Sequence, residues 1–364
     1  MKIKKKVISA LLILILCVTA IPVGITATDY ADATTYQKLK ITWFNVGAGD
    51  SMYMRLPNGK NVLIDGGLTS KGASIVEKLS DRNVSTIDYL VSTHPDADHV
   101  GGLQAVFEEM EVKNFYYPDD AEYDSATAER VMELAYEEGC NLINPERGDK
   151  IKGGNGCVLK FVQSDADYSA DNEDSLAMFI DYGPLEVLVC GDNEKGSQEV
   201  IEKHNVDVLQ LPHHGSKYAT SAAFIKRFDP EFVVVSTDGK RYGHPNKEVF
   251  QRLKAYDKKI KVWRTDKKGD ITITATAKSW KFDKKGTLVS KYCTSSGSTS
   301  GTTGGNVSSG TTSGSTKTYV FTTQTGSKYH KSKSCRGLSN AKAIYKKTLS
   351  TAKGNGLEPC KICC

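Results

Sequence analysis

Four residues that commonly bind divalent metal ions stand within the six-residue run His94-Pro95-Asp96-Ala97-Asp98-His99, directly after an apolar segment at 87–92. Imidazole and carboxylate together suit zinc or manganese, and a larger share of carboxylate favours the harder ion. So many ionisable groups beside a buried strand are unfavourable unless a cation neutralises them. The run therefore predicts a site for two divalent metal ions, against the alternative of a polar surface loop with helix-capping aspartates.

Three further segments place residues of the same types at the ends of apolar, strand-like runs. They are Asp65 in Ile-Asp-Gly-Gly, Asp192 in Cys-Gly-Asp, and the pair His213 and His214 before Gly215. Each of these residues alone is better explained as a polar surface residue. Together with the first run, they indicate a metal-dependent enzyme.

The elements around these motifs predict an α+β protein. Antiparallel strands come first, and strands that alternate with helices follow twice over, which indicates two sheets with helices outside. Among the expected helices are 72–82, 125–138, 195–204 and 246–256. Tyr116, Tyr117 and Trp263 fit strand packing better than a platform for stacking nucleic-acid bases.

These motifs resemble the hydrolase domain of ComEC-type competence proteins, within the metallo-β-lactamase superfamily. The resemblance covers about residues 38–280, with matching segments in the expected order at 44–51, 64–67, 93–102, 190–192, 212–216 and 242–245. It implies an αββα sandwich with a metal site at one edge of the two sheets.

The resemblance also implies which residues bind the two ions. His94 and Asp96 would hold the first ion, and Asp98 and His99 the second. Asp192 would bridge both. Either zinc or manganese would fit this set of ligands.

One histidine of the pair His213 and His214 would complete the second site, with a slight preference for His214. Asp65 would orient a ligand through a hydrogen bond. His244 would contact a substrate phosphate or protonate a leaving group. Asp98 would also help to orient the metal-activated water that attacks the substrate.

The sequence departs from the wider superfamily in two places. Asp96 replaces the usual second histidine of the His-x-His-x-Asp-His signature, which makes the first site more anionic. The usual third histidine has no counterpart, and Asn172, Asp174 and Ser175 lie where it would fall. Both departures favour manganese more than in the typical family member.

The C-terminal tail carries a second metal-binding pattern, His330-x4-Cys335 followed by Cys360-x2-Cys363. Such spacing predicts a structural zinc ion, which a module with few core residues would need. The tail also resembles the zinc-binding module of Ada-type DNA-repair proteins. Disulfide bonding is the alternative, and Cys364 supplies a further thiol.

Composition divides the chain into four parts. A basic start followed by an apolar stretch predicts a signal peptide at 1–27, with cleavage as late as residue 33 as a variant and an uncleaved membrane anchor as the alternative. The hydrolase domain would cover 34–293, a Ser/Thr/Gly linker 294–316, and the zinc module 317–364. No multi-spanning membrane region is expected.

Charge is distributed unevenly among these parts. The chain carries +5 in total, the N-terminal segment +4 and the tail +9, so that residues 28–316 carry −8. The basic tail suits a polyanion such as DNA or an anionic cell-wall polymer. The acidic body suits nucleic acid less well.

The sequence therefore predicts a secreted metal-dependent phosphodiesterase, a nuclease that acts on DNA. One alternative is hydrolysis of a non-nucleic substrate: a lactam, a lactone, or phosphocholine on a wall polymer. Another is a non-catalytic metal-binding or DNA-binding protein that keeps the fold, which the complete set of aspartates disfavours.

Overall fold

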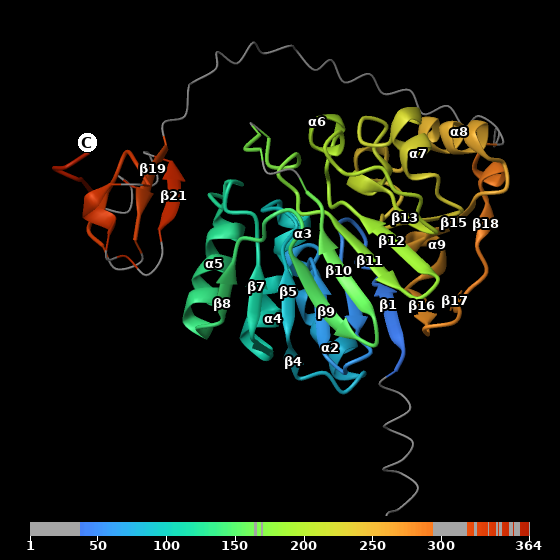
Figure 1. Cartoon of the computed structure of the whole chain (residues 1–364), viewed down its shortest axis with the longest axis horizontal. Helices are drawn as coiled ribbons and strands as arrows, with labels where there is room; N and C mark the ends of the chain where they lie inside the picture. Colours follow the sequence, from blue (N-terminus) through green and yellow to red (C-terminus); the bar gives the residue numbers. More distant parts are fainter. Residues whose placement is uncertain are drawn as a thin grey trace, which may run out of the picture. The chain divides into compact units, whose positions relative to one another are not determined.

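The computed structural model describes residues 37–293, except 164, 165 and 169, and residues 319–363, except 324–325, 334, 340, 342–343, 349–351 and 353–356. The expected signal peptide, the linker and Cys364 lie outside the described residues. Residues 37–293 form four layers, in which two sheets face each other and helices cover both outer faces (Figure 1). The predicted αββα sandwich is confirmed. Within the described part of the chain, no helix has the length and apolar character needed to cross a membrane.

The first sheet has eight strands in the order β17-β16-β1-β2-β3-β5-β7-β8. The strands are β1 (Leu39–Trp43), β2 (Met52–Arg55), β3 (Asn61–Ile64), β5 (Tyr89–Val91), β7 (Asn114–Tyr116), β8 (Asn141–Ile143), β16 (Ile271–Ala275) and β17 (Trp280–Phe282). β3, β5, β7 and β8 run parallel, and the remaining pairs are antiparallel. The short strands β4 (Thr86–Ile87) and β6 (Glu111–Val112) pair beside it.

The second sheet also has eight strands, in the order β18-β15-β14-β13-β12-β11-β10-β9. The strands are β9 (Lys150–Gly154), β10 (Cys157–Phe161), β11 (Met178–Tyr182), β12 (Leu185–Val189), β13 (Val208–Gln210), β14 (Phe232–Val235), β15 (Lys261–Arg264) and β18 (Thr287–Leu288). β12 to β15 are parallel to one another. Each sheet therefore has a parallel half, in which all carboxyl ends point to the same edge.

Helices cover the outer face of each sheet. Against the first sheet pack α2 (Gly72–Ser80), α4 (Leu103–Glu109) and α5 (Ala126–Glu138), and against the second pack α7 (Ala222–Phe228) and α8 (Lys247–Tyr256). Short helical segments are η1 (Thr69–Lys71), α3 (Ala97–Val100), α6 (Lys195–Gln198), η2 (Pro212–Gly215), η3 (Arg241–Gly243), α9 (Thr265–Lys268) and η4 (Val289–Tyr292). The helix expected at 195–204 is only α6, because the chain leaves helical geometry after Gln198.

The parallel strands are apolar on both faces, which is why they can form the centre of a four-layer protein. In β3, Val62 and Ile64 contribute to the core between the sheets, while Leu63 packs toward α2 and α4. In β13, Val208 faces the inner core and Leu209 faces α7 and α8. Each fully buried side chain of this size stabilises the fold by about 1.5–3 kcal/mol. Trp263 is buried in the core between the sheets, and Tyr116 packs against that core. Both residues therefore serve strand packing, as the sequence predicted.

The tail, described by itself, is small. Strand β19 (Tyr319–Thr322) pairs antiparallel with β21 (Tyr345–Thr348), and β20 (Lys328–Tyr329) pairs with β22 (Glu358–Pro359). A 3₁₀ helix, η5 (Arg336–Leu338), follows Cys335. The buried apolar residues of the tail form two clusters of three residues each. One contains Val320, Tyr329 and Ala352, and the other contains Cys335, Leu338 and Cys360.

Candidate metal centre

The metal-binding motifs lie at the carboxyl ends of the parallel strands in both sheets. Asp65 follows β3, His94 follows β5, Asp192 follows β12, and His213 and His214 follow β13. Ligand sites in α/β proteins form at such ends, because backbone groups and loops converge there. The two sheets thus bring their motifs to one edge of the sandwich.

The loop of His94–His99 is clamped by two neighbouring loops. The backbone carbonyl of Asp98 accepts a hydrogen bond from the N–H of Asp50 at 3.2 Å, and that of His99 accepts one from the N–H of Gly66 at 2.6 Å. Gly49 lies so close that a Cβ atom would stand 2.0 Å from the Asp98 carbonyl oxygen, and its φ is +97°. Only glycine fits this position, which explains the Gly-Ala-Gly-Asp turn before β2.

His99 is fixed by Asp65 and Thr93. Its Nδ1 lies 2.9 Å from Asp65 Oδ2, and the same carboxylate accepts hydrogen bonds from the hydroxyl and the backbone N–H of Thr93 at 2.7 and 2.8 Å. Burial alone would lower the pKa of His99, but the carboxylates of Asp192 and Asp65 raise it well above the usual range. The Nε2 atom of His99 is left pointing at Asp192 Oδ1, 3.3 Å away.

His94 and Asp96 face Asp192 from the other end of the same loop. His94 Nε2 lies 3.7 Å from Asp96 Oδ2 and 4.0 Å from Asp192 Oδ2. His94 is fully buried, whereas the side chain of Asp96 is half exposed. Interaction with His94 lowers the pKa of Asp96, so this carboxylate is ionised at neutral pH.

His214 approaches the group from the second sheet. Its Nδ1 lies 3.2 Å from the carbonyl oxygen of Ser236 and 3.3 Å from Asp50 Oδ1, and its Nε2 lies 3.7 Å from both Asp98 Oδ2 and Asp192 Oδ2. Burial would lower the pKa of His214, but Asp192 and Asp50 raise it to about 9.

His213 is placed differently from its neighbour. Its Nδ1 lies 3.0 Å from Glu194 Oε1, its Nε2 lies 3.5 Å from Asp192 Oδ2, and it is less buried than His214. Both histidines have a positive φ, 51° and 53°. This conformation costs non-glycine residues about 1 kcal/mol or more each, and such strain concentrates at functional sites. The N–H of His213 donates to the Gly191 carbonyl at 3.1 Å, which ties this turn to the Asp192 loop.

Several buried polar atoms at this edge have no hydrogen-bond partner among the described residues. They are Nε2 of His94, Nε2 of His99, Nε2 of His214, Oδ1 of Asp192 and Oδ1 of Asp50. Ligand atoms of His94, His99 and Asp192 all lie within 4.8 Å of one another, as do those of Asp98, His99 and His214. Buried imidazole and carboxylate atoms without partners are costly unless they bind a cation. The site therefore fits divalent metal ions.

Asp50 belongs to this group, although the sequence did not single it out. It is buried, and its Oδ2 accepts a hydrogen bond from Gln210, whose Oε1 in turn accepts one from Trp43 Nε1 at 2.7 Å. Ligand atoms of Asp50, Asp192 and His214 lie within 4.8 Å of one another. Its only signal in the sequence was its place in the segment 44–51, which carries the turn glycines.

Of the three residues at the place of the missing histidine, Ser175 and Asn172 contact the loop that carries Asp192, and Asp174 contacts Tyr168. Ser175 Oγ accepts a hydrogen bond from the N–H of Asp192 at 3.1 Å, and the Asn172 carbonyl accepts one from Asn193 at 3.4 Å. Asp174 Oδ1 accepts from the N–H of Tyr168 at 2.9 Å. The contacts of Ser175 and Asn172 thus support the loop that carries Asp192.

His244 lies beside His213, with their ring centroids 5.2 Å apart. Burial, followed by the nearby His213 and His214, lowers the pKa of His244 to about 4. Its imidazole is therefore neutral at pH 7, when it can donate or accept a hydrogen bond but carries no charge.

In the tail, the four predicted residues come together. Ligand atoms of His330, Cys335, Cys360 and Cys363 all lie within 4.8 Å of one another. The Sγ atoms of Cys335 and Cys360 are 3.9 Å apart, nearly twice the length of a disulfide bond, and Cys363 Sγ lies 3.8 Å from His330 Nδ1. Thiolates bound tetrahedrally to zinc at about 2.3 Å are separated by roughly 3.8 Å. The cluster fits a small zinc module.

Two facing sheets flanked by helices, with histidines and aspartates gathered at one edge, define a metal-dependent hydrolase fold. Comparison with known families leads to the same class: residues 44–239 match the metallo-beta-lactamase superfamily. The chain belongs to that superfamily.

The chain is also similar to several curated proteins, as the motifs predicted. ComE operon protein 3 of Bacillus subtilis is 30% identical over 256 residues, which cover 64% of this chain and 32% of that protein. Competence protein ComA of Neisseria gonorrhoeae is 28% identical, covering 66% of this chain and 33% of that protein. Recombination protein 2 of Haemophilus influenzae is 26% identical, covering 60% and 27%. The chain spans about a third of the length of these relatives, and its resemblance to ComEC-type competence proteins is confirmed.

Proposed function

We propose that this protein is a secreted metal-dependent phosphodiesterase that cleaves DNA. The observation that carries the proposal is the convergence of three imidazole Nε2 atoms and two carboxylate oxygens, all buried and without hydrogen-bond partners among the described residues. Such a set can bind two divalent ions, and zinc and manganese both accept mixed imidazole and carboxylate ligands.

The first ion is assigned to His94, Asp96 and Asp192, and the second to Asp98, His99 and His214. Asp192 would serve both ions, because its carboxylate oxygens lie 3.3–4.0 Å from His94, His99 and His214. His214 is preferred to His213 since its Nε2 is buried and has no hydrogen-bond partner among the described residues, whereas the side chain of His213 is more exposed. His213 then flanks the site.

Divalent ions in such a site lower the pKa of a coordinated water and stabilise negative charge that develops on the substrate. The chain itself orients the ligands. Asp65 holds Nδ1 of His99, and the Ser236 carbonyl holds Nδ1 of His214, so that in both rings Nε2 is presented as the donor atom. His244, neutral at pH 7, is placed to donate a hydrogen bond to a substrate oxygen.

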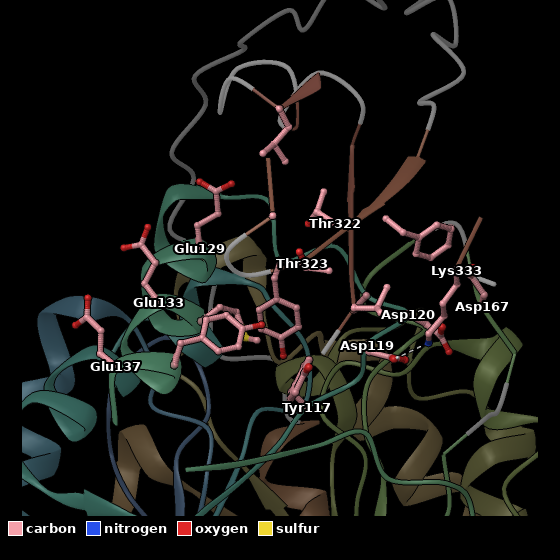
Figure 2. Close-up of a pocket in the computed structure, with 18 residues that line it drawn as sticks. Tyr117, Asp119, Asp120, Glu129, Glu133, Glu137, Asp167, Thr322, Thr323 and Lys333 are labelled. Atoms are coloured by element: carbon pink, nitrogen blue, oxygen red, sulfur yellow. Dashed lines mark hydrogen bonds and ion pairs between the residues drawn. The ribbon is translucent and has the colours of Figure 1, made fainter. Parts of the chain in front are cut away.

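DNA is the substrate favoured by the relatives and by the tail. The relatives are named for competence and recombination. The tail carries +9, and one structural zinc held by one histidine and three thiolates leaves it strongly basic. The body supplies less attraction: Glu129, Glu133 and Glu137 follow one another along α5 (Figure 2), and Arg130 pairs with Glu133 at 3.3 Å.

A non-nucleic substrate is the second candidate, and the charge of −8 on residues 28–316 is the observation that favours it. Duplex binding relies on basic surface, whereas a lactam, a lactone or phosphocholine on a wall polymer does not. The third candidate, a protein that binds metal or DNA without catalysis, keeps the fold and the ligands.

One substrate panel separates these three functions. The protein is incubated with Mn²⁺ or Zn²⁺ and with DNA, RNA, bis-p-nitrophenyl phosphate or nitrocefin, each with and without chelator. We expect cleavage of DNA and of the phosphodiester, lost on adding chelator. Turnover of nitrocefin alone would favour the second candidate, and no turnover of any substrate the third.

A further inference from the structure

Two tyrosines near the metal centre are far more exposed than large apolar side chains elsewhere in the body. Tyr218 is 68% exposed and Tyr242 is 77% exposed, whereas the next most exposed among the described residues 37–293 is Leu288 at 44%. Tyr218 comes four residues after His214, and Tyr242 two residues before His244. Exposed aromatic rings beside a catalytic centre indicate a surface for a ligand rather than core packing.

The turn that carries Tyr218 is rigid although its ring is exposed. Arg252 donates hydrogen bonds to the carbonyls of Lys217 and Thr220 at 2.6 and 2.7 Å, and the N–H of Tyr218 donates to Ser216 Oγ at 3.3 Å. The next residue, Ala219, is fully buried. The ammonium of Lys217 lies 5.2 Å from the centroid of the Tyr218 ring. This hydrogen-bonded turn thus exposes the Tyr218 ring and the Lys217 ammonium side by side.

Tyr242 sits on a turn built in the same way. Asp238 Oδ1 accepts hydrogen bonds from the N–H groups of Lys240 and Arg241, both at 2.8 Å, and Tyr242 itself has a φ of 54°. This conformation is unfavourable for an aromatic residue, so that the surrounding contacts must impose it. The guanidinium of Arg241 lies 5.9 Å from the ring centroid, and the His244 ring lies 6.1 Å away.

A single side chain joins the two turns. Asn246 Oδ1 accepts a hydrogen bond from the N–H of Lys217 at 2.7 Å, while its Nδ2 donates to the Gly243 carbonyl at 3.1 Å. Its own N–H donates to the Gly215 carbonyl at 3.0 Å. The backbones next to the two tyrosines are therefore held close together, on the side of the site formed by His213 and His244.

Charge distinguishes this side from the opposite one. Lys217 and Arg241 accompany the tyrosines, whereas Asp171 lies near Asp96 and His94 on the far side. A phosphate chain is attracted to the first side and repelled by the second. Bases stack on exposed aromatic rings only when they are unpaired, because pairing and stacking in a duplex cover their faces.

We infer that Tyr218 and Tyr242, with Lys217 and Arg241, form a binding surface for single-stranded DNA that leads into the metal centre. The rings stack on unpaired bases, and the two cations contact the adjacent phosphates. This inference rests on the proposed function and specifies its substrate as a single strand.

The test compares variants of the full chain in which only the rings differ. Tyr218→Leu/Tyr242→Leu removes both π surfaces, Tyr218→Phe/Tyr242→Phe keeps them, and Tyr256→Leu removes an exposed tyrosine at the end of α8 as a matched control. Binding of a short fluorescein-labelled oligothymidine is measured by anisotropy in chelator and high salt, where phosphate contacts weaken and stacking remains. KM and kcat are then measured with Mn²⁺ on the same oligonucleotide and on an abasic one.

We expect the double leucine variant to bind the oligothymidine at least about tenfold more weakly, with a raised KM and an unchanged kcat. The phenylalanine variant and the Tyr256→Leu control should match the unaltered protein, and the abasic oligonucleotide should not distinguish any of them. Equal binding by the leucine variant and the control would overturn the inference. Weaker binding without any DNA cleavage by the unaltered protein would reject the proposed function alone, whereas cleavage with an unchanged KM in the leucine variant would reject this inference alone.

Discussion

The body and the tail each gather four or more metal-binding side chains, but they hold them by different means. In the body, histidines and aspartates follow strands of two eight-stranded sheets. Hydrogen bonds donated by Thr93 and Gln210, and one accepted by the Ser236 carbonyl, fix their orientation. In the tail, the ligand atoms of one histidine and three cysteines lie close together, and the strands around them are only two to four residues long. The body has a large core behind its site, and the tail has almost none.

In the body, the fold holds the metal-binding residues in place. In the tail, metal binding is needed for the fold itself. The body can hold its ligands in place before any metal binds, because three hydrophobic clusters stabilise the sandwich. The tail buries too little apolar surface to offset the entropy of ordering its chain, so that metal binding must contribute to its folding. Removing ligands or metal should therefore affect activity in the body and folding in the tail.

Loss of the central carboxylate gives the largest expected effect on activity. In Asp192→Ala, the oxygens that lie between His94, His99 and His214 are absent, and we expect hydrolysis to fall by about 10³-fold or more, several kcal/mol of barrier. Asp98→Ala should behave in the same way. Steady-state rates with Mn²⁺ measure the loss.

The melting temperature of the body and the zinc content of the tail serve as controls for these two variants. Both should remain close to those of the unaltered protein, because the sandwich core is not touched. Activity retained in both variants would show that the assignment of the metal centre is wrong.

The tail should show the opposite response. Cys360→Ser removes one of four ligands and leaves a buried position without its partners, so we expect the loss of about one zinc per chain and of protection from proteolysis within 317–364. Cys293→Ser, which changes a half-buried cysteine outside the cluster, is the matched control. Metal analysis and limited proteolysis measure both effects. A protected tail in the presence of chelator would contradict the comparison and favour disulfide bonding.

Much of this architecture can be predicted from the sequence alone, because the motifs indicate both which residues bind metal and where they lie relative to the strands. The apolar run before His94 and the alternation of strands and helices predict the layers, and the spacing in the tail predicts its cluster. The helix expected at 195–204 covers only Lys195–Gln198, and Glu173, 23 and 24 residues away in the chain, caps its first turn by accepting hydrogen bonds from the N–H groups of Gly196 and Ser197. Local periodicity cannot anticipate such a contact.

The site residues that the sequence missed are those whose role depends on partners distant in the chain. Asp50 reaches His214 across the two sheets and is held by Gln210, 160 residues away. Tyr218 and Tyr242 are ordinary residues in the sequence, and only their exposure beside the site sets them apart. By contrast, Asp65 could be assigned its orienting role because it stands in a recognisable motif.

A smaller effect is expected from changing how a ligand is oriented. Asp65→Asn keeps the shape of the side chain but weakens its hydrogen bond with His99 Nδ1, now 2.9 Å from the carboxylate. Loss of such a partner lowers metal affinity or activity by about 10–100-fold. Titration of metal-free protein with Mn²⁺ measures the affinity. An unchanged affinity together with a lower melting temperature would show that Asp65 only stabilises the fold.

The smallest predicted effect concerns the stability of the body. This stability should depend on pH, whereas the folding of the tail should depend on metal. Burial raises the pKa of Asp174 to about 7 from its usual 3.8, and Asp167, Asp120 and Asp171 add to the shift. The folded body therefore keeps this proton up to neutral pH, while the unfolded chain releases it near pH 4. The stabilisation from Asp174 is complete below pH 4 and is lost as the pH rises to about 7.

Asp174→Asn should remove this dependence, because the amide oxygen can still accept the hydrogen bond from the N–H of Tyr168 and carries no charge at any pH. We expect the variant to melt about 2–4 °C above the unaltered protein at pH 8 and close to it at pH 4. Thermal unfolding followed by circular dichroism at both pH values, in chelator, isolates the body from metal effects in the tail. Parallel pH profiles for the two proteins would mean that the pKa of Asp174 is the same in the folded and the unfolded chain, and would contradict this prediction.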